Sequence, residues 1–252
     1  MNMISPNQNK DVALIVGPTA SGKSALALET AAHERDMLPI LVGGTGLYVR
    51  TLLDGIAPIP EIDPEIRHEI RGLETLEAYE ALQRLDPVSA ERLNPADRTR
   101  IQRALEVVRS TGRPLDHWHR HKKGGIASRI KLHPLVLLPS RDWLYQRCNL
   151  RLDAMIETGA KDEVELLLSR KLPPNQPVMR AIGVAEIAAW LAGDITRDVA
   201  VERAQTATRR YAKRQYTWFR NQCPSGWPRA NESLYDDFDS IFGTILRGQA
   251  LT

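Results

Sequence analysis

The stretch GPTASGKS at positions 17–24 constrains this sequence more than any other feature. It has the spacing Gly-x-x-x-x-Gly-Lys-Ser, and it lies between the apolar run Val12–Val16 and a helix-forming run that starts at Ser24. A glycine loop between a buried strand and a helix can turn successive backbone N–H groups inward, toward the positive end of the helix dipole. An ordinary glycine turn is the alternative, but the full spacing and both flanks disfavour it. The pattern predicts a phosphate-binding cradle made of Gly17, Pro18, Thr19, Ala20, Ser21, Gly22, Lys23 and Ser24.

Two cradle side chains have predicted roles of their own. Lys23 would place a point charge on the terminal phosphate oxygens, and the Ser24 hydroxyl would hold a magnesium ion that bridges them. A second apolar run, residues 38–42, leads into another glycine turn that contains Thr45. Because ligands of open parallel sheets bind at the carboxyl ends of the strands, we expect Thr45 near the cradle. A glycine turn with a hydroxyl helix cap explains this second motif alone about equally well.

The composition fits a globular enzyme. The 252 residues are 42% hydrophobic and 26% charged, which is enough for one sizeable core and a smaller satellite. No apolar stretch approaches the length that spans a bilayer, and the N-terminus has no apolar signal-peptide centre, so we expect a cytoplasmic protein without a membrane partner. The two cysteines cannot form a disulfide framework. We expect a monomer.

The middle of the chain changes from α/β patterning to helices alone. From about Pro64 to Gly112 the apolar spacing is helical, and the segment Pro95–Ser110 carries Ile101, Leu105 and Val108 on one stripe. Gly112 is expected to end that helix. The predicted fold is α/β, with a P-loop NTPase-like parallel sheet core in residues 1–62 and 131–252. An all-helical insertion would occupy residues 63–130.

A basic segment follows the predicted helices. Residues 113–131 contain six lysines and arginines against the single acid Asp116, with two glycines in the middle, and we expect a mobile loop. Its alternating histidines, His117, His119 and His121, could bind a metal ion, but a mobile surface loop without a cluster of acidic or cysteine ligands disfavours this alternative.

A long cationic helix is predicted near the C-terminus, from about Thr196 to Arg220. At 100° per residue, Ala204, Ala207, Tyr211 and Trp218 fall in one arc that should face the core. Within residues 200–220 six cations stand against one acid, Glu202. A solvated helix face normally mixes both signs, so this imbalance predicts a polyanionic partner. The cations form two rows, which are Arg209, Lys213 and Arg220, and Arg203, Arg210 and Arg214.

Together these motifs resemble one family, the tRNA dimethylallyltransferases. The similarity is carried by GPTASGKS, LPILVGGTGLY at 38–48, DPVSAERLNPADRTRIQRALEVVRSTGRPL at 86–115, RAIGVAEI at 180–187 and TATRRYAKRQYTWFR at 206–220. The resemblance implies transfer of a dimethylallyl group from dimethylallyl diphosphate to the exocyclic amine of the tRNA adenosine on the 3′ side of the anticodon. It implies Mg²⁺ as cofactor and the anticodon stem-loop of tRNA as partner.

The resemblance also implies individual roles. Lys23, Thr45 and Arg209 would serve catalysis, with Arg209 as a pyrophosphate clamp, although the family pattern Thr-Arg-Gln reads Thr208-Arg209-Arg210 here. The implied tRNA-binding residues are Gln102, Arg103, Ala104, Leu105, Arg180, Gly183, Lys213, Arg214, Gln215, Trp218 and Arg220.

One family motif is missing. The family has a strand ending in Asp-Ser-x-Gln-Val-Tyr, whose aspartate is the expected general base, followed by several dozen residues. Here only the five residues from His33 to Met37 separate the cradle helix from the matching run that begins at Leu38. Either a further stretch belongs to the polypeptide at this point or the segment is deleted, and the intact state of the other motifs favours the first alternative.

Two other function classes stay open at this point. A P-loop kinase or other phosphotransferase would need an acidic metal ligand at a strand end, and none follows an apolar strand convincingly. A tRNA-binding but inactive protein is the alternative if the segment is truly deleted.

Overall fold

The computed structural model describes residues 10–33 and 39–231, and these form two compact units. One unit comprises residues 1–48 and 130–252, and the other comprises residues 49–129. The first division therefore falls after Tyr48, whereas the sequence prediction placed it after Ile62. Backbone hydrogen bonds explain the difference, because Ile56 exchanges bonds of 2.9 Å with Lys123 and thereby ties the outgoing segment to the returning one.

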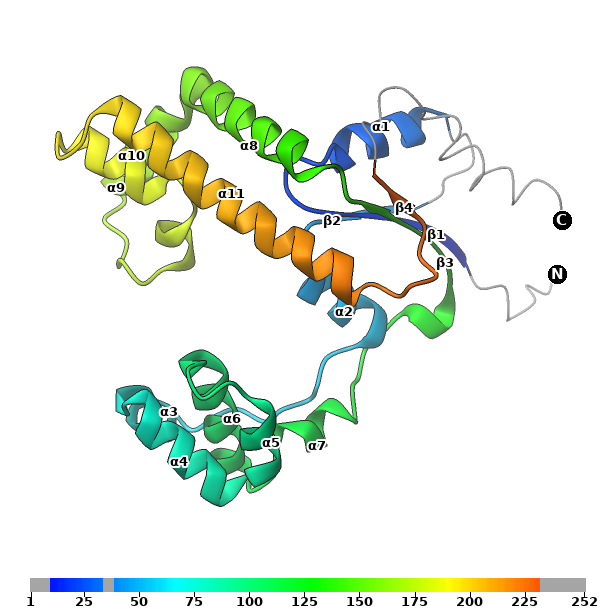
Figure 1. The fold of residues 1–252 in the computed structure, drawn as a ribbon, viewed down its shortest axis with the longest axis vertical. Coiled ribbons are helices and arrows are strands. Elements are labelled where there is room, and N and C mark those ends of the chain that lie inside the picture. The colour runs from blue at the N-terminus through cyan, green and yellow to red at the C-terminus, as the bar shows by residue number, and fades with distance from the viewer. Residues whose placement is uncertain (1–9, 34–38, 232–252) are drawn as a thin grey trace, which may run out of the picture. The chain divides into compact units, whose positions relative to one another are not determined.

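A four-stranded parallel sheet forms the centre of the first unit (Figure 1). Its strands are β1 (Lys10–Val16), β2 (Ile40–Gly43), β3 (Ile130–Leu137) and β4 (Arg229–Ala230), in the order β2-β1-β3-β4. Val16 pairs with Gly43 on one side and with Val136 on the other, so the strands end at one common edge. This arrangement confirms the predicted P-loop NTPase-like α/β core.

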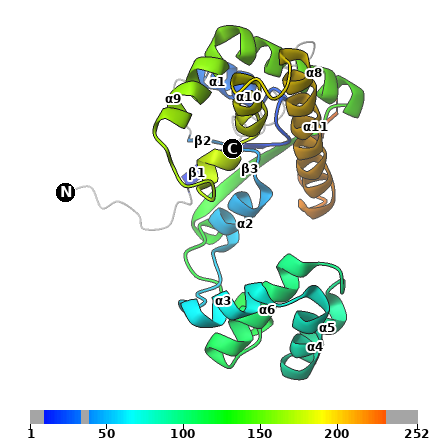
Figure 2. The same cartoon turned by 90° about the vertical axis from the view of Figure 1, so that its left-hand side faces the viewer.

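The helices of this unit surround the sheet and extend from it. They are α1 (Lys23–His33), the start of α2 (Gly46–Asp54), α8 (Arg141–Met155), a π-helical turn η2 (Ile156–Ala160), α9 (Lys161–Ser169), a 3₁₀ turn η3 (Pro177–Arg180), α10 (Val184–Leu191) and α11 (Arg197–Gln222). The Ser140 hydroxyl caps α8, and the Thr196 hydroxyl caps α11, as helix-start signals predict. Helices α8 and α11 pack against each other (Figure 2).

Apolar side chains make several clusters in this unit, and two of them join the main elements. Ile15, Leu135 and Leu137 of the sheet pack against Leu26 of α1. A second cluster joins α8, α9, α10 and α11 through residues that include Leu152 and Ala204. Both cysteines, Cys148 and Cys223, are buried and take part in no disulfide.

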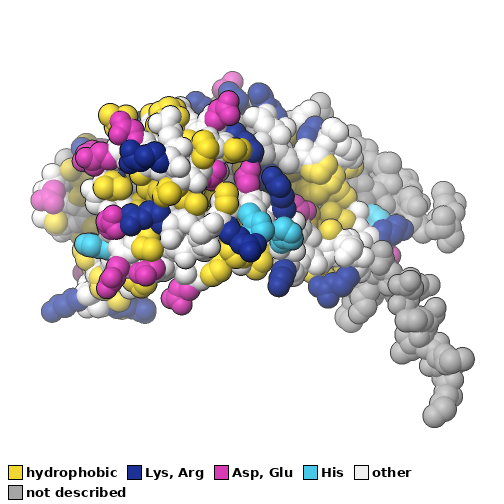
Figure 3. All heavy atoms as spheres, turned by 90° about the horizontal axis from the view of Figure 1, so that it is seen from below, with side chains coloured by type: hydrophobic (Ala, Val, Ile, Leu, Met, Phe, Trp, Pro, Cys, Tyr) yellow, Lys and Arg dark blue, Asp and Glu magenta, His cyan; other side chains and the backbone are white. Residues whose placement is uncertain are grey.

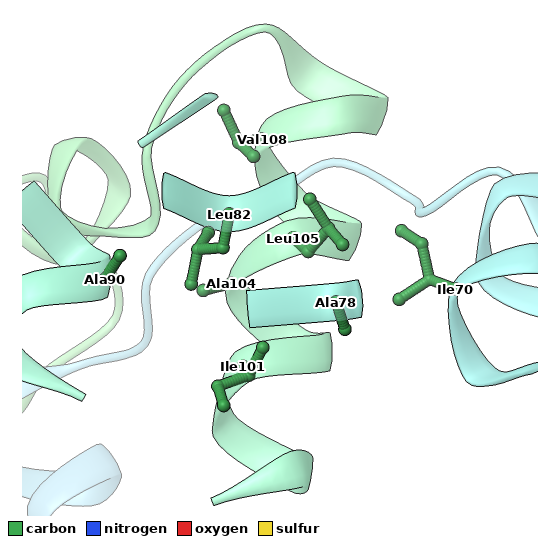
Figure 4. Packing of buried hydrophobic residues seen from close by; sticks show 8 residues of the cluster. All are labelled: Ile70, Ala78, Leu82, Ala90, Ile101, Ala104, Leu105 and Val108. Atoms are coloured by element: carbon green, nitrogen blue, oxygen red, sulfur yellow. The ribbon is translucent and has the colours of Figure 1, made fainter. Parts of the chain in front are cut away.

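The second unit is helical. It contains α3 (Pro64–Gly72), α4 (Thr75–Leu85), α5 (Pro87–Arg92), α6 (Arg98–Thr111), α7 (Leu115–His119) and the 3₁₀ turn η1 (Ala127–Arg129). Apolar side chains from α3 to α6 point toward one another in its core (Figure 4). Aspartates cap three of these helices, and Gly112 ends α6 with a left-handed φ of 66°. Helix α6 begins at Arg98 and not at Pro95, because the Asp97 carboxylate caps the Arg100 N–H after a turn at 94–97.

The predicted mobile basic loop is folded. It contains α7 and η1, and the Lys122 ammonium lies 3.1 Å from the Asp54 carboxylate. His117 contacts Arg113 at 2.8 Å, and the described residues contain no group of three or more His, Cys, Asp or Glu side chains suited to a metal ion. No helix among the described residues is long and apolar enough to cross a membrane.

Candidate functional site

The phosphate cradle has the geometry that its sequence predicts. It joins the end of β1 to the start of α1, and Gly22 adopts a left-handed φ of 90°. Ala20 also has a positive φ, 62°, which is uncommon for a residue with a side chain. At Gly17 a Cβ would lie 2.5 Å from the Leu137 carbonyl oxygen of β3, so a larger residue cannot occupy this position without a shift. The loop is therefore curved tightly around its own backbone N–H groups, as an anion-binding nest is.

A cavity of about 370 Å³ opens beside the cradle. Cradle residues Ala20, Gly22, Lys23 and Ser24 form one wall, and α8 supplies the other with residues that include Arg147 and Arg151. The Ser21 hydroxyl is 1% exposed and has no hydrogen-bond partner in the described part of the chain. A buried donor without a partner is costly unless a ligand completes it, and a phosphate oxygen is a suitable acceptor.

The sequence did not single out Arg147 and Arg151. They lie four residues apart on α8 and so share one helix face. The sequence could have pointed to these arginines, because α8 follows β3 directly and β3 ends at the same sheet edge as β1.

Two cations of this region, Lys23 and Arg209, form no ion pair with a carboxylate of the described residues. The Lys23 ammonium donates to the Pro18 carbonyl at 2.6 Å, and no carboxylate of the described residues pairs with it. Burial, and secondly the charge of Arg151, lower the pKa of Lys23 to about 8. The Arg209 guanidinium donates to neutral partners, the Asn149 amide oxygen at 2.7 Å and the Thr206 hydroxyl at 2.8 Å. Such a site favours an anionic ligand, because an anion would offset the mutual repulsion.

The second glycine turn lies beside the cradle, as predicted. The Gly17 N–H donates to the Gly43 carbonyl at 3.3 Å, and a Cβ on Gly44 would lie 3.7 Å from the Lys23 ammonium nitrogen. Thr45 is thus held at the edge of the phosphate site. Its catalytic role stays a prediction.

Two predicted RNA-binding residues of α11 contact this turn instead. The Gln215 side chain is 9% exposed, accepts from the Thr19 N–H at 2.7 Å and donates to the Gly44 carbonyl at 2.5 Å. The Trp218 ring lies against Gly46, where a Cβ would approach it to 2.1 Å. These contacts do not favour the assignment of Gln215 to an RNA-facing surface, because both ends of its amide are bonded to the two glycine turns.

The predicted core arc of α11 needs a similar correction. Ala204 is buried, but the other fully buried positions of the helix are Ala200, Ala212, Gln215 and Phe219. Tyr211 is half-buried and lies under the Arg214 guanidinium, whose carbon is 5.8 Å from the ring centre. Hydrophobicity alone misplaced the arc, because backbone groups of the glycine turns satisfy a buried glutamine.

Burial does not favour three further RNA-binding assignments. Ala104 and Leu105 are 1% and 0% exposed and point into the helical core (Figure 4). The Gly183 N–H donates to the Glu186 carboxylate and caps α10, so this buried glycine serves the helix start. These three residues are next in the sequence to polar residues of the same motifs, but their own side chains or backbone groups serve the packing of the protein.

Other assigned residues remain able to meet a partner. Arg180, Lys213, Arg214 and Arg220 are exposed. In the helical unit the Gln102 amide donates to the Ile70 carbonyl at 3.2 Å, and the Arg103 guanidinium, 42% exposed, lies 3.4 Å from the Glu106 carboxylate. Their RNA contacts stay predictions.

The missing aspartate motif is absent from the full sequence. The chain runs from His33 to Pro39 through five residues, and residues 34–38 lie outside the described part of the structure. The expectation of further residues at this point is wrong for this 252-residue chain, and the deletion alternative describes it. Strand β2 is consequently the outer strand of the described sheet, and its Val42 is 44% exposed.

A glycine cradle at the carboxyl edge of a parallel sheet, faced by Arg147 and Arg151 of α8, defines a P-loop α/β protein with a site for a phosphorylated ligand. The family model described as IPP transferase matches residues 22–222, and the chain belongs to this family.

Relatives and solved structures agree with the family. A tRNA dimethylallyltransferase of Novosphingobium aromaticivorans is 61% identical over 199 residues, which cover 79% of this chain and 71% of the relative. The crystal structure of the full-length tRNA isopentenylpyrophosphate transferase from Bacillus halodurans is similar with a TM-score of 0.56 and 26% identity, covering 96% of this chain and 99% of that chain.

A third comparison bears on the deletion. The alignment with a tRNA dimethylallyltransferase of Chelativorans sp., 39% identical, runs over 286 residues and covers 86% of this chain and 98% of the relative. The alignment is longer than the whole of this chain. The relative therefore contains residues that have no counterpart here.

Proposed function

We propose that this chain transfers a dimethylallyl group from dimethylallyl diphosphate to the exocyclic amine of the tRNA adenosine on the 3′ side of the anticodon. One observation carries the proposal: the described residues that line the cavity at the cradle include Lys23, Arg147 and Arg151 and no carboxylate. A diphosphate is an anion of suitable size for this cavity. Family membership supplies the reaction class.

The residues of the cavity suit the departure of diphosphate. In the reaction the C1–O bond of the donor breaks, the amine nitrogen bonds to C1, and the nitrogen loses one proton. Negative charge grows on the leaving oxygens as the allylic carbon becomes cationic. Cradle N–H groups, the Lys23 ammonium and the arginines are placed to stabilise that charge, which is the main source of rate in such a step.

Magnesium fits the cradle as an ion shared with the substrate. The Ser24 hydroxyl is exposed in the first turn of α1, beside Lys23. Mg²⁺ prefers oxygen ligands, keeps several waters and is commonly held by one or two protein groups together with phosphate oxygens. Ser24 would hold the ion, which would help to neutralise the leaving diphosphate.

The proton on the amine needs no strong base. Once the nitrogen is bonded to the allylic carbon it carries a positive charge and two protons, so these protons are acidic and water can accept one of them. The absence of the family's aspartate would then lower the rate of transfer and the precision with which the adenine is placed, but it would not prevent transfer of the dimethylallyl group. This reasoning favours a working transferase over a protein that only binds tRNA.

The acceptor is supported by the exposed cations of α11. Lys213, Arg214 and Arg220 are exposed on the helix whose inner face contacts the glycine turns. A free nucleotide would need only a small pocket, whereas an RNA backbone is bound by rows of cations. In an anticodon stem-loop the target base is stacked on its neighbours, so the enzyme must take it out of the stack before the amine can react.

The test compares acceptors at equal concentration. Purified protein with dimethylallyl diphosphate and Mg²⁺ should modify an anticodon stem-loop with consecutive adenosines far faster than AMP or ATP. Equal rates on stem-loop and nucleotide would refute the tRNA acceptor but leave the transferase. Tight stem-loop binding without any transfer would instead identify the inactive alternative.

A further inference from the structure

We propose that Gln215 is a positioning residue that holds the two glycine turns of the donor site at a fixed separation. The inference rests on the proposed function, since it concerns the site where donor and acceptor would meet. Gln215 belongs to α11, whereas the two turns follow β1 and β2. One side chain thus joins three segments that are distant in the sequence.

The chemistry of its partners determines how Gln215 is oriented. The Thr19 N–H can only donate, so it must bond the amide oxygen, at 2.7 Å. The Gly44 carbonyl can only accept, so it must bond the amide nitrogen, at 2.5 Å. Both bonds require the same orientation of the amide. Only glutamine offers a donor and an acceptor at this reach, because glutamate lacks the donor and leucine lacks both.

The two bonds end on the groups that matter for the reaction. Thr19 lies in the cradle, so the bond to its N–H holds the backbone whose neighbouring N–H groups form the phosphate nest. Gly44 precedes Thr45, so its carbonyl determines where the Thr45 side chain stands. Burial to 9% exposure keeps water from replacing either partner.

Trp218 supports the same turn from the next turn of the helix. It lies three residues after Gln215, and its ring occupies the space that a Cβ on Gly46 would need. Helix α11 therefore contacts the Gly43–Gly46 turn at two points, on both sides of Thr45. The polar contact connects to the cradle, and the aromatic contact does not, which makes Gln215 the specific link.

The experiment replaces the amide while keeping its size. Gln215→Leu removes both bonds, and Gln205→Leu is the matched control, because Gln205 is a partly buried glutamine of the same helix that donates to Asp153 at 2.8 Å. We expect Gln215→Leu to lower kcat by about 10- to 100-fold, as misplacement near a reacting centre does, with the stem-loop KM within about twofold. Gln205→Leu should keep both values.

A charged variant adds a readout that a purely structural role would not give. In Gln215→Glu the carboxylate can still accept from Thr19 but faces the Gly44 carbonyl without a donor, and a protonated carboxyl restores both bonds. The ratio of Gln215→Glu to wild-type kcat should therefore rise as the pH falls from 8 to 6. A flat ratio, or wild-type kcat in Gln215→Leu, would overturn the proposal.

Binding of inorganic pyrophosphate separates this inference from the proposed function. Calorimetry should show binding about tenfold weaker in Gln215→Leu than in wild type and in Gln205→Leu. If wild type binds pyrophosphate but transfers no prenyl group, the reaction assignment fails and the positioning role can still be read. If both leucine variants weaken pyrophosphate binding equally, the proposed positioning role of Gln215 is wrong.

Discussion

The helical unit of residues 49–129 and the cradle edge of the other unit treat positive charge in opposite ways. In the helical unit the Arg109 guanidinium lies 2.7 Å from the Glu69 carboxylate, and the buried Glu106 faces both Arg71 and Arg103. Acidic side chains lie among lysines and arginines over the face seen in Figure 3. This unit pairs several of its arginines with its own carboxylates.

The cradle edge leaves its charges for a ligand. Lys23 and Arg151 raise each other's electrostatic cost, and Arg209 donates only to neutral oxygens. Ala20 holds a positive φ there, and the Ser21 hydroxyl is buried without a partner among the described residues. Features that lower stability gather at functional sites, because the ligand completes them.

The contrast assigns different work to similar side chains. An arginine of the helical unit stabilises that unit through its carboxylate, whereas a cation of the cradle acts on something that binds. Substitutions should separate the two roles, since one set changes unfolding and the other changes turnover.

The largest effect is expected at Lys23. Lys23→Ala should lower prenyl transfer by about 10²–10³-fold (~3–4 kcal/mol), because it removes a charge from the leaving diphosphate in a partly buried site. Stem-loop affinity should stay nearly the same. Single-turnover rates and filter binding would measure both, with Arg109→Ala of the helical unit as the control for turnover. Normal turnover in Lys23→Ala would remove the cradle from the reaction.

Leu105 tests the helical unit in the same way. It is fully buried at the centre of the cluster in Figure 4, so Leu105→Ala should reduce the free energy of unfolding of that unit by about 3 kcal/mol through lost burial and a residual cavity. Urea unfolding followed by circular dichroism would measure the change. If Leu105 faced RNA, as the resemblance first implied, the variant would instead keep its stability and lose affinity.

Local sequence patterns were enough to predict the cradle and most helix ends. The cradle depends on residues within eight positions of one another, and Ser140, Thr196 and Gly112 act on backbone groups in their own turn. The parallel sheet follows from the same reasoning, because two strand-to-glycine turns imply one common edge.

Contacts between distant segments were not predictable in this way. Arg151 reaches the cradle from a helix more than a hundred residues later, and Gln215 was assigned to RNA because a glutamine beside cations normally points outward. Ala104 and Leu105 were carried along with an RNA-facing motif, although helix geometry turns them toward the core. Each error concerns which way a side chain points, and that depends on partners far away in the sequence.

A smaller effect links the cradle to stability. Lys23 has a pKa of about 8 in the folded state and 10.5 as the ordinary value, so below pH 8 the folded chain bears the full cost of a buried charge. Lys23→Met should therefore raise the free energy of unfolding at pH 7 by about 2 kcal/mol, allowing for partial solvent screening. Wild-type stability should rise relative to the variant between pH 8 and 10.5, where only the folded state has lost the proton. If the free energy of unfolding differed between Lys23→Met and wild type by the same amount at pH 7 and at pH 10, this prediction would be contradicted.

The smallest expected effects concern the exposed cations of α11, and they decide whether the contrast between the two units extends to RNA. Lys213→Ala and Arg214→Ala should each weaken stem-loop binding and reduce the slope of log affinity against log salt by about one unit or less, because one phosphate contact and its released counterion are lost. Turnover at saturating stem-loop should change little. Arg109→Ala is the matched control, since its guanidinium is already paired with Glu69 and should contribute nothing to the slope. If Arg109→Ala flattened the slope as much as the α11 variants, the pairing of charges in the helical unit would not distinguish it from the RNA-binding surface. If neither α11 variant changed the slope, their exposed face would be a solvated surface, and the acceptor RNA would have to be bound elsewhere.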